Sequence, residues 1–181
     1  MIYLLRHGQT QWNAKNLLQG HTDIPLNTNG VKQALKVARE IESVKIDYIF
    51  SSDLSRAKET AEIINTQANL SVKITIDERL RETYLGKLEK RFIKDITQEE
   101  WRKFDESPEL YNAETWEQRY QRVNSFWKEI KNMQNVLIVT HAGTIALLRY
   151  CSKYHNFNLP LIKQVYNKEL TAHHCTLTKL I

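Results

Sequence analysis

Basic side chains stand directly after three short apolar segments of this sequence. The segments span residues 2–5, 47–52 and 136–140, and short apolar runs of this kind are typical of buried parallel strands. The basic groups that follow them are Arg6, His7, Arg56 and His141. Positive groups gathered at one place repel one another unless an anion binds among them. The spacing therefore predicts an anionic ligand.

Phosphate fits these groups best, because it is a compact dianion that guanidinium groups and backbone amides hold well. In a parallel α/β sheet, ligands bind beyond the carboxyl ends of the strands, where helix N-termini add unpaired N–H groups. Asn13 and Gln19 are further candidate donors. Gly8 and the Ala142–Gly143 turn are candidates because a missing side chain lets the backbone approach a ligand closely.

The same residues predict a phosphoryl-transfer reaction. A histidine beside arginines has a lowered pKa and stays neutral, and a neutral imidazole is a nucleophile that accepts a phosphoryl group. The second histidine and the arginines would stabilise charge on the transferring group. An alkoxide leaving group also needs a proton from an acid. The acids that follow the segment 72–76 are Asp77, Glu78, Glu82 and Glu89, and spacing alone does not choose among them.

Strand and helix patterns alternate along the chain, which predicts a three-layer α/β/α sandwich around a mostly parallel sheet. Two further strands are predicted, an edge strand at 72–76 and a C-terminal strand within 175–181. Apolar residues at helical spacing predict helices after a cap at Asn27 or Thr28, behind Asp53, over 116–130, and from about Thr144. The stretch 84–113 breaks the alternation and predicts a helical excursion over one end of the sheet, a candidate lid.

Composition predicts one domain over residues 1–181 and no membrane span, because no apolar run is long enough. No leader is visible, so we expect a cytoplasmic protein. A net charge of +5 is too small and too dispersed to indicate nucleic-acid binding. The group of Lys87, Lys90, Arg91 and Lys94 is read as a solvated face. Cys151 and Cys175 have neither a disulfide framework nor a metal-ligand spacing and are expected to be buried thiols.

Five blocks in order resemble the histidine phosphatase superfamily, in its phosphoglycerate-mutase-like branch. They read LLRHGQTQWN, LQGHTDIPLNTNGVKQA, SSDLSRAKETAEII, DERLRETYLGKLEKR and VLIVTHAGTI. The resemblance implies that His7 becomes phosphorylated and that Glu82 protonates the leaving group and then activates water. It also implies a phosphate pocket, without metal or other cofactor, and assigns to it Arg6, Asn13, Gln19, Arg56, His141 and Gly143.

Two positions depart from the family pattern and bear on the substrate. Lys90 stands where the family often has glycine, and Ala-Glu-Thr at 113–115 stands where many members have Gly-Glu-Ser. The length of the chain is closer to the phosphatase members than to the mutases. We therefore expect a metal-independent phosphatase acting on small phosphomonoesters, as a monomer or homodimer.

Several alternatives remain open from the sequence. One is a cofactor-dependent phosphoglycerate mutase. Another is a phosphatase dedicated to α-ribazole phosphate, phosphoserine or a sugar phosphate. A third is an inactive phosphate-binding regulatory module, although all five residues of the predicted chemistry are present.

Overall fold

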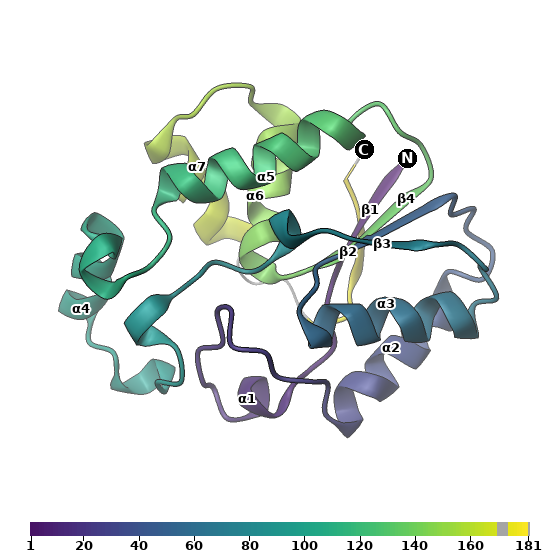
Figure 1. The fold of residues 1–181 in the computed structure, drawn as a ribbon, viewed down its shortest axis with the longest axis horizontal. Coiled ribbons are helices and arrows are strands. Elements are labelled where there is room, and N and C mark those ends of the chain that lie inside the picture. Colours follow the sequence, from purple (N-terminus) through teal and green to yellow (C-terminus); the bar gives the residue numbers. More distant parts are fainter. Residues whose placement is uncertain (170–173, 181) are drawn as a thin grey trace.

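A five-stranded sheet lies at the centre of the molecule (Figure 1). The computed structural model describes residues 1–169 and 174–180. The strands are β1 (Ile2–Arg6), β2 (Tyr48–Ser51), β3 (Ile74–Ile76), β4 (Val136–Thr140) and β5 (Leu177–Lys179). Their order is β3-β2-β4-β1-β5, and only β5 runs antiparallel, beside β1. The predicted mostly parallel sheet is confirmed, with β3 at an edge.

Helices cover both faces of the sheet, which confirms the predicted three layers. They are α1 (Gln11–Ala14), α2 (Thr28–Glu40), α3 (Ser55–Gln67), α4 (Gln98–Glu106), α5 (Trp116–Ile130), α6 (Ala142–Lys153) and α7 (Leu159–Glu169). Figure 1 shows α2 and α3 on one side of the strands and α5, α6 and α7 on the other. In the described part of the chain, no helix has both the length and the apolar character needed to cross a membrane.

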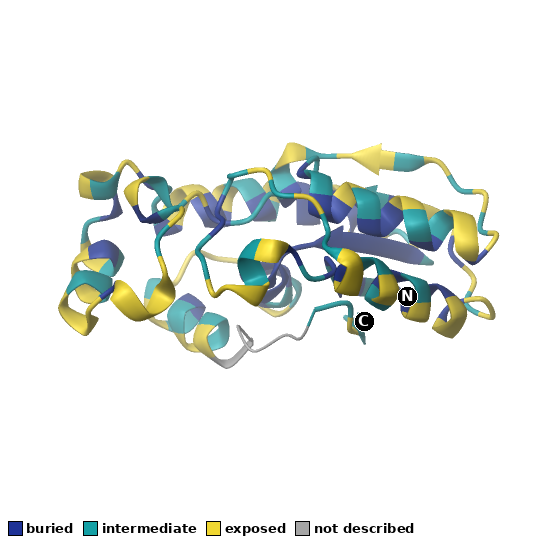
Figure 2. Cartoon of the chain, turned by 90° about the horizontal axis from the view of Figure 1, so that it is seen from below, coloured by how far each residue is buried: buried dark blue, intermediate teal, exposed yellow. Residues whose placement is uncertain are grey.

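The strands are apolar on both faces because each face packs against a helical layer. Leu4 and Ile138 belong to the core under α5 and α6, whereas the next residues, Leu5 and Val139, belong to the core under α2 and α3. All five residues of β4 are buried, and the centre of the molecule is dark in Figure 2. This double burial explains why the strands read as continuous apolar runs rather than as alternating ones.

Helix starts follow the expected capping chemistry, with one correction. Asn27 caps α2, since its side chain accepts a hydrogen bond from the backbone N–H of Gly30 at 2.8 Å. The prediction that α6 starts near Thr144 was two residues late. His141 takes the N-cap position with extended backbone (φ −125°, ψ 164°), so the helix begins at Ala142. α1 and α7 were not predicted, and α1 has only four residues.

The excursion over 84–113 has a small apolar core of its own. It contains α4 and three 3₁₀ turns, at Gly86–Leu88, Ile93–Asp95 and Pro108–Tyr111. The buried residues of this small core are Leu88, Ile96, Phe104 and Ala113. In Figure 1 the excursion extends away from the sheet, with α4 at its far end. The helical character predicted for this stretch is therefore present in part, and its role as a lid stays a prediction.

Two glycines let the segment after β1 lie directly on α2. A Cβ on Gly8 would be 2.6 Å from the backbone oxygen of Gly30, and a Cβ on Gly30 would be 2.1 Å from the backbone oxygen of Gln9. Backbone atoms cannot move aside as a flexible side chain does. This packing fixes the path of the chain immediately after His7.

We predict that Gly30→Ala destabilises the protein by about 1–3 kcal/mol, the usual cost of overpacking. Helix propensity alone favours alanine by about 1 kcal/mol, so the sign of the change separates the two effects. Urea unfolding measures it, with the exposed Lys32→Ala on the same helix as control. A stabilised Gly30→Ala variant would contradict the close backbone contact.

Candidate active site

A cavity of about 600 Å³ lies at the carboxyl ends of β1 and β4. Its position follows from the parallel pairing, since Arg6 at the end of β1 pairs in register with Thr140 at the end of β4. The residues predicted to carry the chemistry all line it, namely Arg6, His7, Arg56, Glu82 and His141. The structure thus brings together side chains that are up to 135 positions apart in the sequence.

His7 is buried with a defined ring orientation. Its Nδ1 lies 2.7 Å from the backbone oxygen of Gly8, and a carbonyl oxygen only accepts, so Nδ1 carries the hydrogen. Nε2 of the neutral ring therefore keeps its lone pair. Gly8 is held in turn, because its N–H donates to Thr60 Oγ1 at 3.1 Å. The local backbone selects the tautomer that is nucleophilic at Nε2.

Burial lowers the pKa of His7 well below its ordinary value, and the charges of Arg56 and Arg6 lower it further. The predicted direction is confirmed, but burial is a larger cause than the arginines that the sequence suggested. His7 is only 3% exposed. A neutral ring is consequently the form present at neutral pH.

His141 stands beside His7, with ring centroids 5.0 Å apart. Its Nε2 lies 3.0 Å from Ser52 Oγ, and its buried Nδ1 has no hydrogen-bond partner among the described residues. Burial and the neighbouring Arg56 lower its pKa well below the ordinary value. An enclosed ring nitrogen without a partner is a group that a ligand in the cavity satisfies.

Arg56 is a buried cation, 1% exposed. Its Nη1 and Nη2 donate to the backbone oxygens of Thr22 and Gly20, at 3.0 and 2.8 Å. Its Nε has no hydrogen-bond partner in the described part of the chain. Burial lowers its pKa to about 10, so the group stays charged at neutral pH. Glu89 secures the same loop by accepting from the N–H of Thr22 at 3.0 Å.

Of the four candidate acids, Glu82 alone lines the cavity. Asp77 is bonded to Arg79, Glu78 is largely exposed, and Glu89 holds the loop at Gly20–Thr22. The Glu82 carboxylate accepts from the N–H groups of Thr83 and Gly143, at 2.9 and 3.2 Å. This geometry supports the residue that the family resemblance singled out.

The missing side chain of Gly143 makes room for the side chains of Glu82 and Tyr166. A Cβ at this position would lie 2.4 Å from Glu82 Oε1 and equally close to Tyr166 Oη. Gly143 and Ala142 line the cavity, but Gly8 is not among the lining residues. The sequence suggested that the missing side chain of Gly8 makes room for a ligand. In the structure it makes room for the backbone of Gly30.

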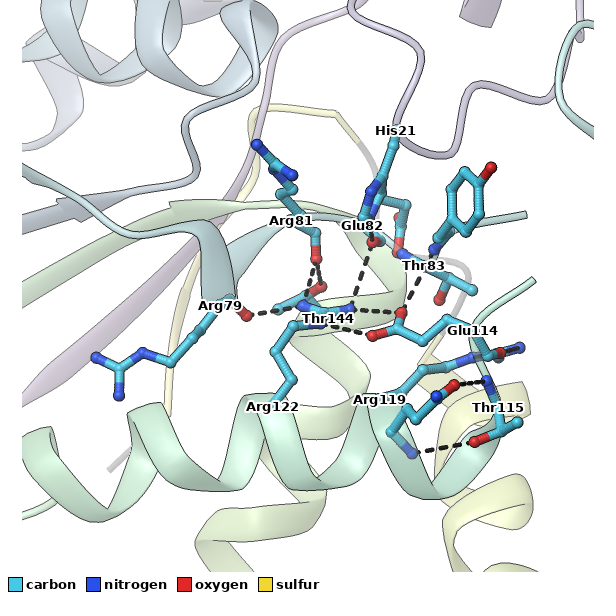
Figure 3. A network of polar contacts seen from close by, with 12 residues as sticks. His21, Arg79, Arg81, Glu82, Thr83, Glu114, Thr115, Arg119, Arg122 and Thr144 are labelled. Atoms are coloured by element: carbon cyan, nitrogen blue, oxygen red, sulfur yellow. Dashed lines mark hydrogen bonds and ion pairs between the residues drawn. The ribbon is translucent and has the colours of Figure 1, made fainter. Parts of the chain in front are cut away.

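Arg122 fixes the loop that carries Glu82, as Figure 3 shows. From α5 it donates to the backbone oxygens of Arg79 and Arg81, at 2.7 and 2.9 Å. Glu114 holds its guanidinium with two hydrogen bonds of 2.7 Å. The backbone oxygen of Glu82 accepts from His21 Nε2 at 2.8 Å. Side chains of Arg122 and His21 thus satisfy the backbone carbonyl groups of the loop that carries Glu82.

Asn13 and Gln19 line the cavity with their amide oxygens already engaged. Asn13 Oδ1 accepts from the N–H of Thr10 at 3.0 Å, and Gln19 Oε1 accepts from the Thr10 hydroxyl at 2.9 Å. These contacts turn the amide groups so that their NH₂ ends are available as donors. This arrangement is compatible with the predicted contacts to phosphate oxygens.

The basic group of the excursion lies apart from the cavity. None of Lys87, Lys90, Arg91 and Lys94 lines it. Lys87 donates to the backbone oxygen of Leu110 at 2.9 Å, and Arg91 pairs with Glu100. This supports a solvated face. Both cysteines are free, with Cys151 buried and Cys175 partly buried, so that prediction is confirmed for Cys151 alone.

Several cavity residues were not recognised in the sequence. They are Trp116, Arg119, Lys163 and Tyr166. At helical spacing, aromatic and basic residues look like ordinary core and surface positions, so no local signal distinguishes them. The ring of His174 makes a T-shaped contact with that of His7, with centroids 5.7 Å apart. Its neighbour His173 lies outside the described residues.

Comparison with known families decides the assignment, because the profile of the histidine phosphatase superfamily (branch 1) matches residues 2–177. The chain belongs to this superfamily. The roles that the resemblance implies for His7, Arg6, Arg56 and Glu82 stay predictions, and the structure shows that these side chains line one cavity.

Curated relatives of the chain include proteins named as probable phosphoglycerate mutases. The chain is 49% identical over 104 residues to a protein of Salmonella choleraesuis named probable phosphoglycerate mutase GpmB, a match that covers 56% of this chain and 47% of that protein. It therefore spans about half the length of the curated relatives it matches.

Two solved structures of phosphatases share the fold. The α-ribazole phosphatase from Shigella flexneri is 27% identical with a TM-score of 0.73, covering 90% of this chain and 83% of that one. The mycobacterial glucosyl-3-phosphoglycerate phosphatase in complex with VO₃ is 27% identical with a TM-score of 0.69, covering 81% and 78%.

The lowered pKa of His7 predicts a pH-dependent stability. The unfolded histidine protonates near its ordinary value of about 6.5 while the buried ring stays neutral. Below that pH the unfolded state binds more protons, so the free energy of unfolding should fall as pH drops from 7 to 5. The slope is at most about 1.4 kcal/mol per pH unit for each such histidine.

Urea unfolding at several pH values measures this slope. His7→Gln should flatten it, whereas the exposed His155→Gln should leave it as in the unmodified protein. An unchanged slope in His7→Gln would show that the ring titrates alike in both states.

Proposed function

We propose that this protein is a metal-independent phosphatase that hydrolyses small phosphomonoesters through a phosphohistidine on His7. The observation that carries the proposal is the fixed tautomer of His7 in a cavity that Arg6, Arg56 and Glu82 also line. A neutral, oriented imidazole beside two guanidinium groups is suited to attack a bound phosphoryl group.

In the first half-reaction, Nε2 of His7 forms a bond to phosphorus as the bond from phosphorus to the leaving oxygen breaks. Arg6 and Arg56 offset the charge on the phosphoryl oxygens. Glu82 in its acid form gives its proton to the leaving oxygen, so the alcohol departs neutral. The ring becomes positively charged, and the carbonyl oxygen of Gly8 on Nδ1–H stabilises that charge.

In the second half-reaction, water attacks the phosphohistidine. Glu82, now a carboxylate, takes a proton from the water as its oxygen bonds to phosphorus. The N–P bond breaks, and the electron pair returns to Nε2. Inorganic phosphate is released, and both His7 and Glu82 return to their starting forms.

A phosphoglycerate mutase is the second candidate, favoured by the 49% identity to GpmB. In that reaction the phosphoryl group passes from His7 to a second hydroxyl instead of water. Incubation with 3-phosphoglycerate and bisphosphoglycerate separates the two activities, because a mutase forms 2-phosphoglycerate and releases little phosphate.

We predict that His7→Ala lowers phosphate release by at least about a thousandfold, the scale expected when a nucleophile is removed. The assay uses a panel of phosphomonoesters in metal chelator, with circular dichroism to verify folding. His155→Gln serves as a matched histidine control. Full activity in His7→Ala would exclude a covalent intermediate on this residue. Activity that is lost in chelator would contradict a metal-independent reaction.

Glu82→Gln should affect substrates according to their leaving groups. General acid catalysis contributes about 10²–10⁴-fold where the leaving oxygen needs a proton. We therefore predict a loss of this size in kcat on alkyl phosphates and a much smaller loss on 4-nitrophenyl phosphate, whose leaving group departs unprotonated. An equal loss on both substrates would argue against an acid role for Glu82.

A further inference from the structure

A third guanidinium, Arg119 on α5, lines the cavity beyond Glu82. The surrounding wall is apolar and includes Leu18, Leu85, Ile93 and Phe104. Arg119 is only 3% exposed. Its Nε and Nη2 both donate to the backbone oxygen of Glu114, at 3.1 and 3.0 Å. Nη1 donates to no residue in the described ranges, so one face of the cation is open to a ligand in the cavity.

Aromatic contacts place Arg119 on the leaving-group side of the cavity. Tyr166 Oη lies against the position of Gly143, next to the Glu82 carboxylate. The Tyr166 ring meets Trp116 edge-to-face, with centroids 4.9 Å apart. The guanidinium carbon of Arg119 lies 4.4 Å from the centre of the Trp116 ring. A group that extends from the leaving oxygen past Glu82 therefore moves along this wall toward Arg119.

Neighbouring carboxylates do not neutralise this cation by direct contact. Glu114 directs both carboxylate oxygens to Arg122, at 2.7 Å each. Asp105 is paired with Lys163 and accepts from Trp116 Nε1 at 2.8 Å. Both neighbouring carboxylates are thus bonded to other cations, and in the described part of the chain no carboxylate makes a hydrogen bond to Arg119. A buried charge without an ionic partner is costly, and a bound anion would offset that cost.

We propose that Arg119 forms a second anion subsite and that the substrate is a phosphomonoester whose leaving alcohol carries a negative group. The inference rests on the proposed phosphatase function and narrows its substrate class. A carboxylate and a second phosphate share the required chemistry, since guanidinium donors bind both. The Tyr166 and Trp116 rings, which lie between Glu82 and Arg119, provide the surface for the carbon chain that links the two anionic ends.

Matched substrates test the subsite. Phosphate esters of ω-hydroxycarboxylic acids with two to five methylenes are compared with n-alkyl phosphates of equal length. The α,ω-alkanediol bisphosphates form a third series, and 4-nitrophenyl phosphate reports the chemistry without an anionic group. For each protein variant, kcat/KM on the acidic ester is divided by kcat/KM on the neutral ester. The fraction of folded enzyme cancels in this ratio.

Arg119→Met and Arg119→Lys are the test variants, and Arg102→Leu is the control. Arg102 is exposed on α4 and pairs with Glu99 and Glu106, outside the cavity lining. We expect the unmodified protein to prefer one acidic series. Arg119→Met should reduce that preference about ten- to a hundredfold, the scale of one charged hydrogen bond. Arg119→Lys should keep part of it, and Arg102→Leu should keep all.

The outcomes separate the two proposals. Hydrolysis of 4-nitrophenyl phosphate that requires His7 supports the proposed function, whatever the ratio. With that activity present, equal rates on acidic and neutral esters would overturn the subsite. A preference for acidic esters that survives in Arg119→Met would also overturn the subsite. Equal losses on all substrates in Arg119→Met would overturn it too, because they indicate a purely structural role for Arg119. If the unmodified protein hydrolyses none of the panel, the phosphatase proposal and the subsite both fail.

Discussion

Burial of the Arg56 cation is the constraint on which much of the site depends. Because Arg56 is only 1% exposed, its N–H groups need hydrogen-bond acceptors within the protein, and its positive charge needs nearby negative groups. Two backbone oxygens of the Gly20–Thr22 loop meet part of the first need, and Glu89 from the excursion holds that loop in place. The N-terminal loop, α3 and the excursion are therefore coupled through the side chains of Arg56 and Glu89.

The position of Glu82 depends on hydrogen bonds to the backbone of the loop that carries it. The loop with Glu82 relies on side chains to bond its backbone oxygens, because buried carbonyl groups without hydrogen bonds are costly. Arg122, Thr144 and His21 supply the missing donors from three separate elements. Because these donors come from α5, α6 and the N-terminal loop, Glu82 takes its place only when the whole domain is folded. Its position is a tertiary property rather than a local one.

This difference explains what the sequence predicted and what it did not. Strand ends, the Asn27 cap and the convergence of His7 and His141 follow from local patterns and from the geometry of parallel sheets. Choosing Glu82 over Glu89 required either the family resemblance or the folded loop. The start of α6 was misplaced because the extended backbone of His141 leaves no signature in residue type. Arg119 was missed because Phe104 on α4, and not only Trp116 on its own helix, lies against the guanidinium group in the fold.

The separate core of the excursion has an evolutionary consequence. Its buried residues, Leu88, Ile96, Phe104 and Ala113, contribute to neither of the two cores that enclose the sheet. Substitutions there reshape one wall of the cavity while the paired strands that present His7 and His141 keep their supports. The cavity is thus built from strand ends held by the sheet and from a wall that packs on a core of its own. Such a division lets a lineage acquire new substrates by drift in about thirty residues, with the reaction itself conserved.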